Sequence, residues 1–179
     1  NGRCATFSDK ADGYARGEGC AGVMVKLMKN AVRDNDRIIG GMFATSVNQD
    51  GRTATMTAPN GPSQERVIRR ALGRARLDVD DIDFIEAHGT GTPLGDPIEV
   101  QALINVFESR TKPLPIGSVK TCFGHMEGVA GILGVIKTIK SFQNRKVPRL
   151  IHCDTLNPRI APFVENGQIQ IPNEEAIPL

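Results

Sequence analysis

The sequence has no strong excess of charge of either sign. It contains 22 lysine and arginine residues against 20 aspartate and glutamate residues, which gives a formal net charge of +2 over 179 residues. A chain so close to neutral has no field that would collect polyanions, so its composition gives no indication of nucleic-acid binding. One basic cluster lies at helical spacing and predicts a solvated helix face: Arg66, Arg69, Arg70, Arg74 and Arg76.

Long apolar runs and paired cysteines are also missing. No stretch approaches the length of a membrane span, and the opening NGRCATFSDK has neither an initiator methionine nor a signal-peptide core. We therefore expect the middle of a larger protein without a membrane span. The four cysteines form no CxxC pair, which favours a reduced setting over a disulfide framework or a zinc site. The expected location is the cytoplasm, with an organelle as the alternative.

Hydrophobic periodicity predicts strands that alternate with helices. This order is typical of an α/β layered fold, and no internal repeat or low-complexity segment interrupts it. A polar loop of at least a dozen residues, 49–62, separates the first two strands from the rest, and loops of this length are often functional. The expected strands cover 20–28, 38–48, 78–87 and 114–120, and the expected helices cover 63–77 (capped by Ser63), 96–109 (capped by Asp96) and 125–144.

The stretch FIEAHGTGTPLGDPIEV places His88 just past the end of a predicted strand. Ligands of open α/β sheets bind at this end of the strands. The glycines after the histidine permit close approach of backbone, and Thr90 and Thr92 offer hydroxyls that donate and accept hydrogen bonds. The loop has no P-loop lysine, so it suits an extended, amide-bearing ligand better than a phosphate. The residues alone leave a Gly-rich turn with a structural histidine equally open.

A second stretch, SVKTCFGHMEGVAG, repeats the order of strand, glycine, histidine and helix. His125 is expected at a helix N-terminus, where the helix dipole favours a neutral imidazole that donates a hydrogen bond to a carbonyl oxygen. Lys120 and Glu127 are expected to form an ion pair across this turn, with a solvated charge pair as the alternative. Two such histidines with a lysine suit the polarisation of carbonyls rather than hydrolysis. The third histidine, His152, has no supporting loop and is interpreted as structural.

At this level of detail the motifs resemble a known family. EAHGTGTPLGDPIE and VKTCFGHMEGVAG resemble the two histidine motifs of β-ketoacyl synthases, specifically those of type I polyketide synthases. GRCATFSDKADGYARGEG and NQDGRTATMTAPNGPSQERVIRRAL resemble other segments of the family, in the expected order, and the resemblance thins after about Pro158. It implies a thiolase-like fold with α-β-α-β-α layers, here incomplete. Residues 1–60 would be the end of the N-terminal half and the connecting loop, and residues 61–179 a truncated C-terminal half.

The resemblance also implies a reaction. Family members are acyltransferases that catalyse the decarboxylative Claisen condensation of acyl and malonyl-type units in polyketide or fatty acid biosynthesis. The substrates are presented on the phosphopantetheine of acyl carrier protein, so no cofactor is bound directly. By resemblance His88 and His125 are the catalytic histidines, Lys120 supports them, and Thr90 and Thr92 contact the pantetheine arm. A homodimer is implied for the full-length protein.

The family's nucleophile, a cysteine in a Cys-Ser-Ser context, is absent from this chain. The fragment alone is therefore expected to be inactive. The alternative is a non-catalytic ketosynthase-like partner subunit that binds carrier protein or a catalytic mate. Cys122 stands where the family usually has asparagine, next to the lysine. A zinc site from His88, His125 and Cys122 would lack local ligand spacing, so no metal is expected.

Overall fold

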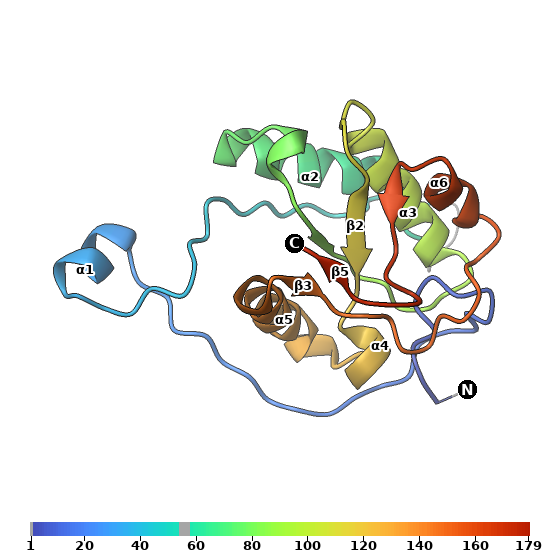
Figure 1. The fold of residues 1–179 in the computed structure, drawn as a ribbon, viewed down its shortest axis with the longest axis horizontal. Coiled ribbons are helices and arrows are strands. Elements are labelled where there is room, and N and C mark those ends of the chain that lie inside the picture. Colours follow the sequence, from blue (N-terminus) through green and yellow to red (C-terminus); the bar gives the residue numbers. More distant parts are fainter. Residues whose placement is uncertain (1, 54–57) are drawn as a thin grey trace.

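The computed structural model describes residues 2–53 and 58–179, so part of the expected loop over 49–62 lies outside the described residues (Figure 1). Its centre is a parallel sheet in the order β1-β2-β4, formed by Ile85–Glu86, Leu114–Gly117 and Ile169–Gln170. Ile85 lies opposite Ile116, and Leu114 lies opposite Ile169. Strand β2 is buried along its whole length, as its apolar run requires.

Helices flank this sheet. Helices α2 (Gly61–Ala75) and α3 (Gly95–Val106) pack together, while α5 (Ala130–Asn144) contacts β1 and β3 (Figure 1). The main core lies between α3 and the sheet and includes Val100, Leu103, Leu114, Ile116, Ile160 and Ile169. The remaining elements are α1 (Met28–Arg33), η1 (Val79–Asp81), α4 (Lys120–Phe123), η2 (Glu127–Val129), β3 (Lys146–Val147), α6 (Ala161–Glu165) and β5 (Ile177–Pro178). None of the described helices is long and apolar enough to cross a membrane.

The expected helices are present, but their first residues differ from the prediction. Asn60, not Ser63, caps α2: its side chain accepts the Ser63 N–H at 3.1 Å, with proline in the first turn. Helix α3 begins at Gly95 with Asp96 inside it, and the Asp96 carboxylate accepts N–H groups from other segments rather than capping the helix. The long helix expected from residue 125 begins only at Ala130, after the short 3-10 turn η2.

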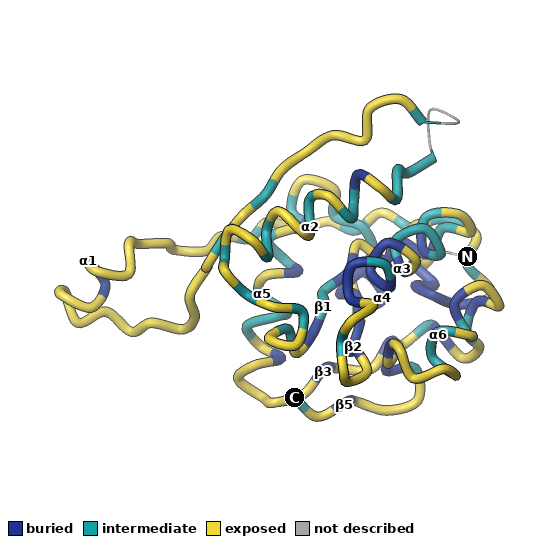
Figure 2. The backbone as a smooth tube through the Cα atoms, turned by 90° about the horizontal axis from the view of Figure 1, so that it is seen from above, coloured by how far each residue is buried: buried dark blue, intermediate teal, exposed yellow. Residues whose placement is uncertain are grey.

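The strands expected over 20–28 and 38–48 are wrong. Residues 20–27 and 38–48 have no strand pairing and Met28 already begins α1; the two segments form an exposed arm that carries α1 at its far end (Figures 1 and 2). Met24 is 98% exposed and Val47 is 83% exposed. A strand needs a neighbouring strand to satisfy its N–H and C=O groups, and none lies beside these segments among the described residues. Apolar, β-branched composition alone therefore did not produce a strand here.

Candidate active site

The two histidines that the sequence singles out lie together. His88 follows β1 and His125 lies between α4 and η2, and their ring centroids are 5.3 Å apart with the rings nearly perpendicular, at 83°. His88 directly follows β1, and His125 follows the adjacent parallel strand β2 after the short helix α4, so the sheet brings their two segments to the same edge. The structure thus creates one imidazole pair from two motifs that are far apart in the sequence.

Glu99 holds the loop that carries His88. This side chain reaches from α3, and its two carboxylate oxygens accept the backbone N–H groups of His88 at 2.7 Å and Gly89 at 2.9 Å. Burial raises the pKa of Glu99 to about 6, against the opposing effect of the two N–H donors. Gly89 has a φ of +48°, and an added Cβ would lie 2.7 Å from atoms of Thr6 and Ser118, so only glycine fits this turn.

The His88 ring is held in its neutral form. Desolvation is the main cause that lowers the pKa of His88 to about 4, and the positive charge of Lys120 and the neighbouring His125 act in the same direction. The residue as a whole is exposed, so a ligand can reach it. A neutral ring with access to solvent can donate one hydrogen bond to an incoming oxygen.

The ring of His125 has a defined tautomer. Its Nδ1 accepts the backbone N–H of Glu127 at 3.0 Å, so the proton of the neutral ring lies on Nε2, which is the free donor. Burial first, then Lys120, lowers the pKa of His125. The expected cause was the dipole of a helix that starts at this histidine. Since α5 begins five residues later, the neighbouring N–H and the lysine take that role instead.

The backbone of His125 is held by the N-terminal segment. Its N–H donates to the Ala15 carbonyl at 2.8 Å, and its carbonyl accepts the Gly17 N–H at 3.1 Å. The Tyr14 ring lies 5.1 Å from the His125 ring. A Cβ at Gly17 would lie 2.1 Å from the Phe123 carbonyl oxygen, so this contact requires glycine.

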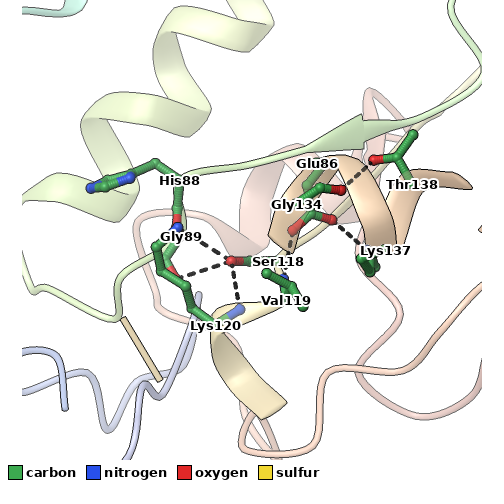
Figure 3. Close-up of polar contacts among 9 residues, drawn as sticks. All are labelled: Glu86, His88, Gly89, Ser118, Val119, Lys120, Gly134, Lys137 and Thr138. Atoms are coloured by element: carbon green, nitrogen blue, oxygen red, sulfur yellow. Dashed lines mark hydrogen bonds and ion pairs between the residues drawn. The ribbon is translucent and has the colours of Figure 1, made fainter. Parts of the chain in front are cut away.

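Lys120 is buried at the start of α4, and its charge acts on both histidines. Desolvation lowers the pKa of Lys120, while the carboxylates of Glu99 and Glu86 oppose this change. Ser118 connects the two motif loops, because its hydroxyl donates toward the carbonyls of His88 and Gly89 and accepts the Lys120 N–H (Figure 3).

The expected Lys120–Glu127 pair is wrong. Glu127 is exposed and instead pairs with Arg16, whose Nε lies 2.6 Å from the carboxylate. The Lys120 ammonium has no ion-pair partner among the described residues. No carboxylate in the described part of the chain neutralises its charge, which therefore lowers the pKa of both histidines.

The two loop threonines lie side by side after His88. Their hydroxyl oxygens are 3.3 Å apart, and the Thr92 hydroxyl accepts the N–H of Gly95 at 3.1 Å. Asp96 supports the same loop from below by accepting the N–H groups of Phe7 and Gly91. Sequence reasoning did not identify Glu99 and Asp96 as loop supports. In the sequence both stand at the start of a predicted helix, where acidic residues are common, and Asp96 is expected there only as a cap.

The remaining sulfur and imidazole groups do not join this pair. His152 lies beside Arg3, with 3.4 Å between its Nδ1 and the guanidinium. All four cysteines are free, and burial raises the pKa of Cys122 and raises that of Cys153 to about 12. Within residues 2–53 and 58–179, no group of three His, Cys, Asp or Glu side chains is arranged to hold a metal ion.

Two family models match most of the chain. Residues 40–154 match the family model described as Beta-ketoacyl synthase, C-terminal domain, and residues 1–31 match the one described as Beta-ketoacyl synthase, N-terminal domain. The expected division of the chain near residue 60 stays a prediction.

Curated relatives and solved structures give the same result. The chain is 48% identical over 159 residues to one of the subunits of the phenolphthiocerol/phthiocerol polyketide synthase of Mycobacterium tuberculosis, a match that covers 88% of this chain and 7% of that protein. It is 44% identical over 176 residues to erythronolide synthase EryA2 of Saccharopolyspora erythraea, covering 98% of this chain and 5% of that protein. The chain thus spans less than a tenth of the length of these relatives.

Among solved structures, the oxazolomycin ketosynthase domain OzmH KS7 of Streptomyces albus JA3453 superimposes with a TM-score of 0.92 at 34% identity, covering 99% of this chain and 30% of that one. The ketosynthase from module 1 of the bacillaene synthase of Bacillus amyloliquefaciens FZB42 has a TM-score of 0.92 at 35% identity, covering 100% of this chain and 33% of that one. Both the family resemblance and the thiolase-like fold are confirmed. The chain belongs to the β-ketoacyl synthase family and forms part of a polyketide-synthase ketosynthase domain.

Proposed function

We propose that this chain supplies the enolate-stabilising half of a ketosynthase active site, in an enzyme that condenses carrier-bound acyl and malonyl-type units. The observation that carries the proposal is the pair of neutral imidazoles, with ring centroids 5.3 Å apart, near one buried lysine. Two N–H donors at this spacing can both reach the oxygen of one thioester. Burial first, and then the charge of Lys120, lowers the pKa of both rings, so both remain neutral hydrogen-bond donors.

The proposed chemistry begins with the malonyl thioester. Its C–C bond to the carboxylate breaks, carbon dioxide leaves, and the electron pair forms an enolate whose oxygen accepts hydrogen bonds from the His88 and His125 rings. The enolate carbon then attacks an acyl thioester on a cysteine outside this chain; the new C–C bond forms, the C–S bond breaks, and the sulfur leaves as a thiolate. The imidazoles contribute by binding the charge that exists only during the reaction, which raises the rate rather than the affinity.

The partners of the proposed reaction follow from its substrates. Thr90 and Thr92 are proposed to contact the amides of the phosphopantetheine arm, which enters on acyl carrier protein, and no other cofactor is needed. The full-length protein is proposed to be a homodimeric acyltransferase of the cytoplasm. The threonines support the proposal because their hydroxyls lie side by side and can donate and accept hydrogen bonds; Thr92 is half-buried and Thr90 is buried behind it.

One observation favours a second candidate. Burial raises the pKa of Cys122 and Cys153, so neither thiol has the lowered pKa of an activated nucleophile. If the rest of the polypeptide also lacks such a cysteine, the chain would belong to a non-catalytic partner subunit that binds carrier protein or a catalytic mate.

The two candidates can be separated with the full polypeptide that contains this chain. It would be incubated with an acyl donor and malonyl-loaded carrier protein, and mass spectrometry of the carrier would record loss of carbon dioxide and the β-ketoacyl product. Formation of that product is the expected result. A polypeptide that binds the carrier but neither decarboxylates malonyl nor forms product would contradict the synthase and favour the partner subunit.

The pH dependence of decarboxylation should reflect the position of Lys120. The rate is expected to begin to fall as the pH approaches the pKa of Glu99, about 6, whose carboxylate holds the His88 loop, and to fall further as the pH approaches the pKa of His88, about 4, where that ring gains a proton. In Lys120→Met the nearby cation is lost, the pKa of His88 rises toward its ordinary value, and the acid limb moves to higher pH. The measurement is decarboxylation rate against pH, with the exposed Lys112→Met as the control. Superimposable acid limbs for Lys120→Met and the unmodified protein would refute this assignment of Lys120.

A further inference from the structure

Glu86, whose carboxylate acts on Lys120, also forms a buried ion pair with a second lysine, Lys137. Lys137 on α5 places its Nζ 2.6 Å from Oε2 of Glu86 on β1, and the two side chains are only 11% and 13% exposed (Figure 3). The Lys137 ammonium also lies 4.2 Å from the centroid of the Phe84 ring. Every other ion pair seen among the described residues joins side chains that are at least 36% exposed.

Two glycines make room for this pair. A Cβ added at Gly117 of β2 would lie 3.0 Å from the Lys137 ammonium, and one added at Gly134 of α5 would lie 3.2 Å from Cγ of Glu86. The backbone on both sides therefore leaves space that the two charged side chains fill. A buried ion pair adds little stability compared with an apolar pair of the same size, so stability alone does not account for the arrangement.

The carboxylate of Glu86 joins both histidine motifs. Glu86 is the last residue of β1, two residues before His88, and its second oxygen, Oε1, accepts the Val119 N–H at 2.6 Å. Val119 directly precedes Lys120. One carboxylate thus connects the strand of His88 to the turn of Lys120, and Lys137 occupies its other oxygen.

We propose that Lys137 is a positioning residue: by holding Oε2 of Glu86, it keeps this carboxylate on the Val119 backbone and away from the Lys120 ammonium. This inference rests on the proposed function, in which Lys120 must keep its charge directed at the two imidazoles. Lys120 is the other cation that acts on Glu86. Without Lys137, the Glu86 carboxylate would turn to Lys120 and neutralise its charge.

The charged groups around the histidines determine whether their pKa should rise or fall when Lys137 is lost. His88 faces Lys120 and His125, and His125 faces Lys120, Glu127 and Arg16. Lys120 in turn faces Glu99, Glu86, Asp96 and Cys4. Of these acidic groups, Glu99 and Asp96 are fixed by backbone N–H donors. Loss of Lys137 would free only Glu86, so neutralisation of Lys120 should raise the pKa of both imidazoles.

The test is an NMR titration of the imidazoles in the full polypeptide, with His152 as an internal reference. In Lys137→Met, the pKa of His88 and that of His125 should rise, while the pKa of His152 stays constant. The double variant Glu86→Gln/Lys137→Met should return both values toward those of the unmodified protein, because glutamine still accepts the Val119 N–H but cannot neutralise Lys120. Lys140→Met, an exposed lysine one turn further along α5, is the matched control and should change nothing.

A second readout follows turnover. Decarboxylation by Lys137→Met should show kcat lowered by about tenfold with KM changed by less than about threefold, and the double variant should recover kcat. Unchanged histidine titration in a folded Lys137→Met protein, or no recovery in the double variant, would overturn the proposal. If Lys137→Met does not fold, the titration is made with Glu86→Gln and with the double variant instead. A rise in the pKa of His88 or His125 in either variant would overturn the proposal. An inactive unmodified protein would count against the proposed function alone, since the titration needs no activity.

Discussion

Replacement of either paired histidine by alanine should lower the kcat of malonyl decarboxylation by about 10²–10³-fold, with KM changed only slightly. Each imidazole is proposed to donate a hydrogen bond to an oxygen that becomes negative only as carbon dioxide leaves. An interaction that strengthens during the reaction affects turnover more than binding. Because His88 and His125 lie 5.3 Å apart and act on one oxygen, their effects should not add, and the double variant should be little worse than the more damaging single variant.

The measurement is release of carbon dioxide from malonyl-loaded carrier protein by His88→Ala, His125→Ala and the double variant. His152→Ala is the matched control: it removes the chain's third imidazole, which lies beside Arg3, and should stay within about twofold of the unmodified protein. Equal decarboxylation by both single variants and the unmodified protein would remove the two histidines from the mechanism.

The largest effect on stability is expected from Asp96→Ala. Asp96 is 1% exposed, and its carboxylate accepts the Phe7 N–H at 2.8 Å and the Gly91 N–H at 3.1 Å. Removal of this acceptor leaves buried donors without partners on two separate segments, and hydrogen bonds to a charged group are the costly ones to lose. The free energy of unfolding should fall by about 3 kcal/mol or more.

Chemical denaturation of the full polypeptide would measure this loss. Asp96→Asn should lie between the unmodified protein and Asp96→Ala, because the amide keeps one acceptor in nearly the same position. Asp83→Ala removes a carboxylate that is exposed, and it should change the free energy of unfolding by less than about 0.5 kcal/mol. A loss at Asp96→Ala no larger than at Asp83→Ala would show that the carboxylate does not hold the two segments together.

The histidine pair was predictable because each histidine lies in a short sequence motif that can be read without knowledge of the rest of the fold. Each motif has its own strand, glycine and histidine, and parallel strands end at the same edge of a sheet, so His88 and His125 could be expected to meet. The strand predicted over 114–120 is present as β2, but it ends at Gly117, and Lys120 already begins α4. The roles of these histidines in catalysis stay a prediction, because proximity does not by itself establish a reaction.

Other features depended on partners that no local pattern indicates. The segment 20–28 has the composition of a strand, but a strand also needs a neighbour, and the described residues provide none. Glu127 was assigned to Lys120 because the two are close in sequence, whereas the fold brings Arg16 beside it. Glu99 and Asp96 looked like helix-start residues, and their backbone partners lie on loops whose course could not be known in advance.

The hydrogen bonds between residues 15–17 and the His125 main chain affect the distance between the two imidazole rings. One imidazole is located by a helix through Glu99, while the other is located by the opening segment of the chain, more than a hundred residues away in sequence. A shift of that opening segment by a fraction of a bond length would change the gap between the rings, although neither ring had been altered. The docking of residues 15–17 therefore sets the spacing of the two donors from a distance.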